Sequence, residues 1–224
     1  MTFTDHIVDI AATATPAEDA LAVARNHLEE ILAALEHGDE AIVDAHPGGQ
    51  PTAMNSAWRA VFVTAPLAHR RRWHAIGVTV VALQSISTHD IPSAAAVNAV
   101  AVGSVVADRI AAVLESTSAT HGWSHRTVAG LIGAGVAAGR MLNLDEAQLR
   151  NAVGLCATQA AGLHAVDESE SAIVQLAKVA ADAVEAAMLA RHGFTSSADG
   201  LGGRRGLFAL LSPGGTWQDH IGAA

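Results

Sequence analysis

Cysteine and positive charge are both scarce in this sequence of 224 residues. Cys156 is the only cysteine, so no disulfide can close within the chain, and a reducing, cytoplasmic setting is expected. Lysine and arginine total 13 against 22 acidic residues, which gives a formal net charge of −9. Binding to nucleic-acid phosphates requires a basic surface that releases counterions, so a nucleic-acid partner is not expected.

Signals for export and for membrane insertion are missing as well. Asp5 and Asp9 occupy the N-terminal region where a secretory signal would have a basic segment followed by an apolar run. The longest uncharged apolar stretch, residues 93–107, is shorter than the roughly 20 residues that cross a bilayer. Half of the residues are hydrophobic, which is enough for one sizeable core. The sequence therefore predicts a soluble protein with one domain, residues 1–224, and no membrane partner.

The sequence also lacks metal and cofactor motifs. Its 12 histidines do not join other ligands in an arrangement typical of a zinc site, so no metal is expected. The glycines between Gly130 and Gly139 lie within a predicted helix and follow no strand, which distinguishes them from a dinucleotide-binding loop. No cofactor is expected.

Apolar residues recur at helical spacing along most of the chain. The valine-rich run 76–86 would also suit a strand, but no partner strand is evident, so it is interpreted as a buried helix. Glycine costs about 1 kcal/mol in a helix, so the four glycines within 126–142 predict a closely approaching neighbour. The prediction is an all-α, compact multi-helix bundle. Its helices cover residues 16–37, 55–67, 76–86, 93–114, 126–142, 143–163, 171–192 and 207–211, with a capping box predicted at 143–146.

A series of short motifs follows in a fixed order along the second half of the chain. Gly122-Trp123 is followed by Gly133-Ala134-Gly135 and then by residues 139–145, and this order resembles a signature of the MmgE/PrpD family. Motifs at 152–155, 159–163, 186–195 and 199–208 continue the resemblance, which is strongest over residues 55–208. The family includes 2-methylcitrate dehydratase, cis-aconitate decarboxylase and iminodisuccinate epimerase. The resemblance implies the family's helical domain, a small carboxylated substrate, no cofactor and a homodimer.

The chain also departs from the family pattern. Family members are about twice as long and have an α/β second domain that closes over the active site, and this sequence ends where that domain would begin. The second domain is therefore expected on a separate chain or not at all. An acidic run that supplies a catalytic carboxylate in the family is replaced here by Arg70-Arg71-Arg72.

Three residues are predicted to be catalytic. His74 aligns with a family histidine, His125 is displaced by one residue from another, and Lys178 matches the lysine of one family branch. His125 is placed at a helix N-terminus, where backbone N–H groups depress a histidine's pKa and favour a neutral general base. The alternatives are an exposed capping histidine at 125 and a lysine paired with Asp182 one turn away.

The substrate-binding candidates surround these residues. His69, Arg71 and Arg72 belong to a cluster of three arginines and two histidines within six residues, which would hold a carboxylate through bidentate contacts. The alternative is a solvated turn whose cations face a helix C-terminus. Trp123, Ser124 and Arg126, beside His125, complete the predicted site.

The leading functional hypothesis is a divergent, cofactor-independent lyase or isomerase that abstracts a proton beside a carboxylate and then eliminates or reprotonates. Because the family's carboxylates are missing, dehydration of a tricarboxylate is in doubt. One alternative is a scaffold that retained the helical fold for dimerisation or partner docking and lost catalysis. Another is a helical domain repurposed to enfold an apolar metabolite and guide its cyclisation.

Overall fold

The computed structural model describes residues 1–37, 52–86, 90–115 and 122–211. Within these ranges the secondary structure is helical, apart from one isolated antiparallel bridge between Trp123 and Leu163, which confirms the all-α prediction. The α-helices are α1 (Phe3–Thr13), α2 (Glu18–His37), α3 (Ala53–Val63), α4 (Ala65–Ala68), α5 (His74–Ala82), α6 (Ala94–Glu115), α7 (His125–Met141), α8 (Glu146–Gln159), α9 (Ser171–Arg191) and α10 (Leu207–Leu211), and the 3-10 helices are η2 (Leu83–Ser85) and η4 (His164–Val166).

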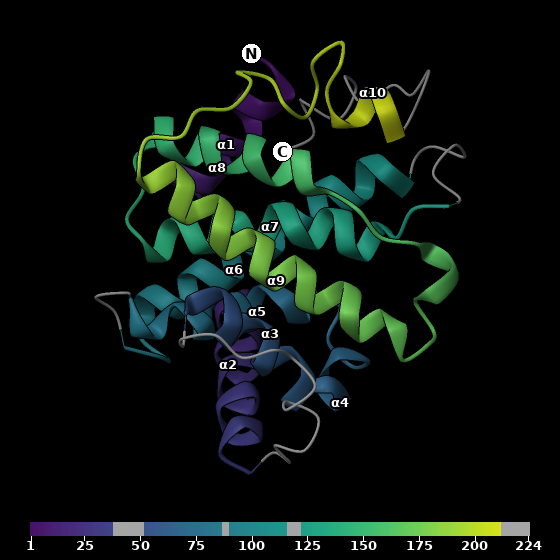
Figure 1. Cartoon of the computed structure of the whole chain (residues 1–224). Helices are drawn as coiled ribbons and strands as arrows, with labels where there is room; N and C mark the ends of the chain where they lie inside the picture. Colours follow the sequence, from purple (N-terminus) through teal and green to yellow (C-terminus); the bar gives the residue numbers. More distant parts are fainter. Residues whose placement is uncertain (38–51, 87–89, 116–121, 212–224) are drawn as a thin grey trace.

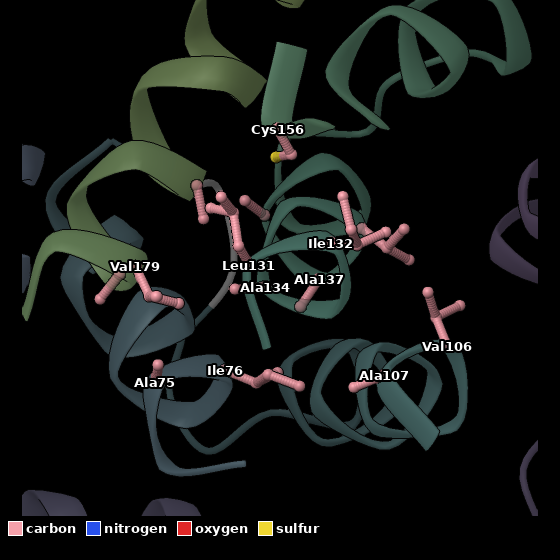
Figure 2. Close-up of a cluster of buried hydrophobic side chains, with 14 of the residues drawn as sticks. Ala75, Ile76, Val106, Ala107, Leu131, Ile132, Ala134, Ala137, Cys156 and Val179 are labelled. Carbon is pink, nitrogen blue, oxygen red and sulfur yellow. The ribbon is translucent and has the colours of Figure 1, made fainter. Parts of the chain in front are cut away.

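Helix α7 forms the centre of the bundle and packs against α5, α6, α8 and α9 (Figure 1). Its glycines allow these close contacts, as predicted. A Cβ built on Gly103 of α6 would lie 2.6 Å from the carbonyl oxygen of Gly133, so the two backbones touch. Figure 2 shows the small side chains of α7, among them Ala134 and Ala137, enclosed by apolar residues of these four neighbouring helices.

Helix α5 is buried along its whole length. It contacts α2, α3, α6, α7 and α9, so no side of the helix faces solvent. This explains why its sequence is apolar without a helical period, and it confirms the interpretation of 76–86 as a buried helix. The helix ends earlier than predicted, at Ala82, where η2 begins.

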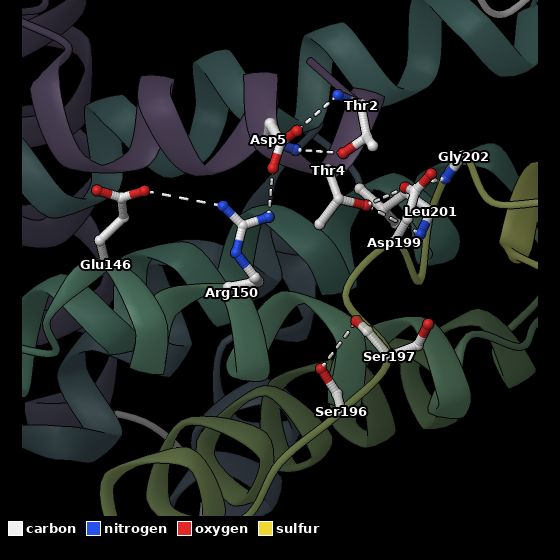
Figure 3. A network of polar contacts seen from close by, with 10 residues as sticks. All are labelled: Thr2, Thr4, Asp5, Glu146, Arg150, Ser196, Ser197, Asp199, Leu201 and Gly202. Carbon is white, nitrogen blue, oxygen red and sulfur yellow. Dashed lines mark hydrogen bonds and ion pairs between the residues drawn. The ribbon is translucent and has the colours of Figure 1, made fainter.

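Helix α1 was not predicted from the sequence. It begins with a capping box in which Thr2 and Asp5 bond each other's backbone, and it packs on α8 and α6. The Thr4 hydroxyl donates to Asp199 Oδ1 at 2.6 Å and accepts from the Leu201 N–H at 3.2 Å. These bonds tie α1 to the segment that follows α9 (Figure 3).

Two predicted helix starts are wrong in detail. Asn143 adopts a left-handed backbone with φ of 54°, and the capping box that starts α8 is formed by Asp145 and Gln148. Helix α2 begins at Glu18 rather than at Pro16. The predicted helix 55–67 divides at Thr64 into α3 and α4, with Pro66 in the first turn of α4.

By length and composition alone, α6 is long and apolar enough to span a membrane. Two observations place it in the core instead: 67% of its most apolar window is buried inside the fold, and it packs on α1, α2, α5 and α7. Its apolar surface is therefore used by other helices of the same chain.

Candidate functional site

The arginine-rich turn between α4 and α5 is held by Arg126, which projects from the first turn of α7. The Arg126 guanidinium donates to the carbonyl oxygens of Ala68, Arg71 and Arg72, the last two at 3.3 Å. Helix C-termini leave carbonyl groups without partners, and a cation there offsets their partial negative charge. Burial lowers the pKa of Arg126. Arg126 therefore shapes the turn, and its Nε and Nη2 groups donate to backbone carbonyl oxygens.

Arg71 forms a two-pronged ion pair with Glu30 of α2. Its Nε donates to Glu30 Oε2 at 3.0 Å and its Nη2 to Oε1 at 2.5 Å. This hydrogen bonding holds the pKa of the Glu30 carboxyl below its usual range. The geometry is the one expected for a bound substrate carboxylate, but a residue of the same chain supplies the carboxylate.

Arg72 is also paired within the chain. Its Nη2 donates to Glu115 Oε1 at 2.7 Å, its Nη1 lies 3.6 Å from Asp108 Oδ1, and its guanidinium stacks 4.6 Å from the centre of the Trp73 ring. The indole Nε1 of Trp73 donates to the same Asp108 oxygen at 2.9 Å. These contacts join the turn to α6.

His74 lies in the core with no exposed surface. Its Nε2 is 2.8 Å from Thr64 Oγ1, and its Nδ1 is 3.2 Å from Nε2 of His27 on α2. Burial and the neighbouring cations lower the pKa of His74 to about 3 and that of His27 to about 4, so both imidazoles are neutral at neutral pH. A substrate in solution does not reach His74 directly in this structure.

His125 is the first residue of α7 and is partly exposed. It lies within electrostatic range of four charged or titratable groups from three other parts of the chain, namely Arg72, Glu115, His164 and Asp167. Burial lowers the pKa of its imidazole, mainly through desolvation. Opposite it, His164 Nδ1 lies 3.0 Å from Asp167 Oδ2. His121, four residues before His125 in the sequence, lies outside the described residues.

The other predicted site residues either lie away from the arginine-rich turn or make contacts that stabilise the fold. Ser124 is buried and caps α7, Trp123 pairs with Leu163, and His69 is exposed at the end of α4. Lys178 pairs with Asp182 on the surface of α9. It lines a different, smaller cavity of about 130 Å³.

The structure thus leaves Lys178 in a cavity of its own and separates the arginines from His125. Arg71 and Arg72 line a cavity of about 410 Å³ between α2 and α6, and His125 lies within electrostatic range of His164 and Asp167. The sequence reasoning missed His27 and Glu30. One signal was available for His27: it lies three residues after Ala24 and four before Ile31, within the apolar stripe of the predicted helix.

The model of the MmgE/PrpD N-terminal domain matches residues 67–220. The chain belongs to the MmgE/PrpD family. The match includes the arginine-rich turn and α5 to α9, and every predicted site residue lies within the matched range. His27 and Glu30 precede the part of the chain that matches the family. No curated protein matches the chain.

Proposed function

We propose that the chain is a cofactor-independent lyase or isomerase that acts on a small carboxylated metabolite, with His125 as the proton-transfer group. The observation that carries this proposal is the placement of a neutral, partly exposed imidazole at the N-terminus of α7, beside Arg72 and the His164–Asp167 pair. A histidine that acts as a base near neutral pH must be unprotonated and within reach of its substrate. His125 is partly exposed and meets both conditions, whereas His74 is fully buried.

The chemistry that this placement supports is proton abstraction beside a carboxylate. His125 would take a proton from the adjacent carbon, and the electron pair left behind would delocalise into the carboxylate. The backbone N–H groups at the start of α7 and the Arg72 guanidinium offset the added negative charge. A hydroxyl on the next carbon would then leave as water with the proton from His125. In an isomerisation, a water molecule would instead give a proton to the opposite face of the carbon, and His125 would later release the abstracted proton to the resulting hydroxide.

Solvent exchange measures this step without knowledge of the product. The protein is incubated in D₂O with a panel of small di- and tricarboxylates, and loss of each C–H signal beside a carboxylate is followed by proton NMR. We expect exchange of at least one compound, and a loss of about 100-fold or more in His125→Gln, the range typical of a general base. His192→Gln, which changes an exposed histidine at the end of α9, is the matched control.

A non-catalytic scaffold is the second candidate, and one observation favours it. Arg71, Arg72 and Lys178 are all paired with carboxylates of the same chain. No exchange with any member of the panel would support this candidate over the enzyme. Both candidates include a homodimer, which the resemblance to the family suggests; a monomer mass in light scattering would contradict that part of the proposal.

A further inference from the structure

A further cavity lies at the opposite end of α7 from His125. Its volume is about 590 Å³, and its wall is formed by the last turn of α1, the starts of α6 and α8, the end of α7 and the turn 143–144. Pockets that bind small molecules have volumes of about 300–1,000 Å³. The two ends of α7, a helix of 17 residues, are about 24 Å apart. A ligand in this cavity would therefore leave the surroundings of His125 free.

The guanidinium of Arg140 is fixed between two sides of this cavity. Its Nη1 donates to the carbonyl oxygen of Ala11 on α1, and its Nη2 donates to Asn98 Oδ1 on α6 at 2.6 Å. Both acceptors belong to residues that line the cavity, so the guanidinium lies in the cavity wall. Its Nε makes no hydrogen bond with the described residues and is not buried from solvent. Arg140 therefore keeps donor groups that a ligand can reach.

The side chain of Asn98 adds a second donor beside the first. A guanidinium can only donate, so the Asn98 atom that contacts it is the oxygen, and Nδ2 is left with both of its protons. In the described parts of the chain Nδ2 has no hydrogen-bond partner, and it too is accessible to solvent. Two neighbouring groups of unused donors thus lie in one wall. A carboxylate has two oxygens that only accept, so it matches such a pair.

Arg140 also lacks a counterion. It makes no ion pair with a carboxylate of the described residues, in contrast to Arg71, Arg72 and Arg150. Burial lowers the pKa of Arg140, so the fold disfavours its charged form. The C-termini of α1 and α7 and the N-termini of α6 and α8 meet at the cavity, and their partial charges of opposite sign offset one another. A bound anion would balance the charge that remains on Arg140.

Glu146 lines the same cavity and limits the charge of a ligand. Its side chain is 71% exposed and lies 3.7 Å from Arg150, whose shorter contact, at 2.6 Å, is with Asp5 (Figure 3). The negative charge of Glu146 is therefore only weakly balanced. It repels a second carboxylate on the ligand, which disfavours di- and tricarboxylates.

We propose that this cavity binds a small monocarboxylate, whose oxygens accept from Arg140 and from Asn98 Nδ2 and whose hydrocarbon part packs against Leu144 and Leu149. The unbalanced cation and the adjacent donors select a carboxylate over a neutral amide of the same shape. The two leucines line the cavity and provide the apolar part of the contact. The site does not depend on any reaction at His125.

The first test compares three compounds with one carbon skeleton. The acid anion 4-methylpentanoate, its amide and the amino acid leucine are titrated into the full chain at about pH 7.5 and low salt, followed by calorimetry and by NMR of the Arg140 Nε–H and Asn98 amide signals. We expect the acid to bind at least about tenfold more tightly than the amide, because hydrogen bonds to a charged acceptor are stronger. Equal affinity would overturn the proposal. Leucine binding tenfold more tightly than the acid would replace it with an amino-acid site in which Glu146 holds the ammonium group.

The second test uses Asn98→Asp, which keeps the acceptor for Arg140 and replaces Nδ2 with a negatively charged oxygen. It should weaken binding by about 100-fold or more, because like charges then face each other. Its midpoint in urea unfolding should equal or exceed that of the wild type, since Arg140 gains a counterion. Unchanged binding would place the anion elsewhere and overturn the proposal.

Two more variants keep the test decisive. Asn151→Asp is the matched control: it makes the same charge change outside the cavity wall, where Asn151 Oδ1 accepts from the Ser196 N–H at 3.0 Å. It should bind the acid as the wild type does. Glu146→Gln removes the repulsive charge and should tighten binding of the acid by up to about fivefold. Weaker binding in Glu146→Gln would contradict the proposed charge selection and overturn the assignment to a monocarboxylate.

Discussion

Acid should destabilise this fold between about pH 7 and pH 5, well before most carboxylates titrate. His27 and His74 have pKa values of about 4 and about 3 in the fold, against 6.5 for an ordinary histidine. The folded state thus disfavours their protonation. Stability is fully present above pH 6.5, and it is lost as the pH falls from 6.5 towards the folded values, because the unfolded chain binds protons first.

The magnitude follows from the same values. At pH 5 the unfolded histidines are almost fully protonated and the folded ones are still neutral. Each histidine then costs about 1.4 kcal/mol per pH unit below 6.5, or about 2 kcal/mol at pH 5. The pair together should remove about 4 kcal/mol, which is a large part of a typical stability of about 5–15 kcal/mol. His125 adds a smaller effect of the same sign, since burial lowers its pKa as well.

Urea unfolding at a series of pH values measures this directly. The double variant His27→Leu/His74→Leu replaces both partners with apolar groups of similar size, and Thr64 keeps its bond to Ala60. We expect it to be folded at pH 8 and to lose most of the pH dependence. His192→Gln should retain the wild-type slope. If wild type and double variant show equal slopes between pH 7 and pH 5, the burial argument is refuted.

Four further predictions concern packing, tertiary contacts and burial. Gly133→Ala should destabilise the protein by about 1–3 kcal/mol in urea unfolding, because its Cβ would collide with the α6 backbone. Gly130→Ala, whose Cβ meets nothing closer than 3.9 Å, should instead be neutral or stabilise by up to about 1 kcal/mol. Thr4→Val should cost about 1–3 kcal/mol, because the N–H of the buried Leu201 would lose its acceptor. Cys156 should react with a thiol reagent only after unfolding, since it is fully buried and burial raises the pKa of its thiol.

The sequence predicted best those features that depend on the residues of a single helix. The apolar run that became α5 and the glycines of α7 predicted burial and close packing correctly. Helix α1 was missed because an 11-residue helix is marginal alone. Its stability comes from distant residues, for example the 2.6 Å ion pair between Asp5 and Arg150 (Figure 3).

The candidate site was harder to predict because its arginines pair with carboxylates that are distant in the sequence. Arg71 pairs with a carboxylate 41 residues earlier, and Arg72 with one 43 residues later. A local cluster of cations indicates an anion site only if no other helix supplies the anion. The motif at 69–74 was therefore recognisable, whereas the neutralisation of its charge depended on how α2 and α6 pack against it.

The histidine pair also explains how α5 is oriented. Every side of this helix is apolar, so hydrophobic burial alone does not fix its rotation about its own axis. His74 and Gly77 are three residues apart and therefore lie on one face of the helix. His74 bonds His27 and Thr64, and Gly77 makes room for the His27 ring. Any other rotation would leave a buried imidazole without partners and turn a larger side chain towards His27. An imidazole without hydrogen-bond partners in an apolar environment raises the free energy of the fold substantially, so two residues suffice to specify one orientation of the helix.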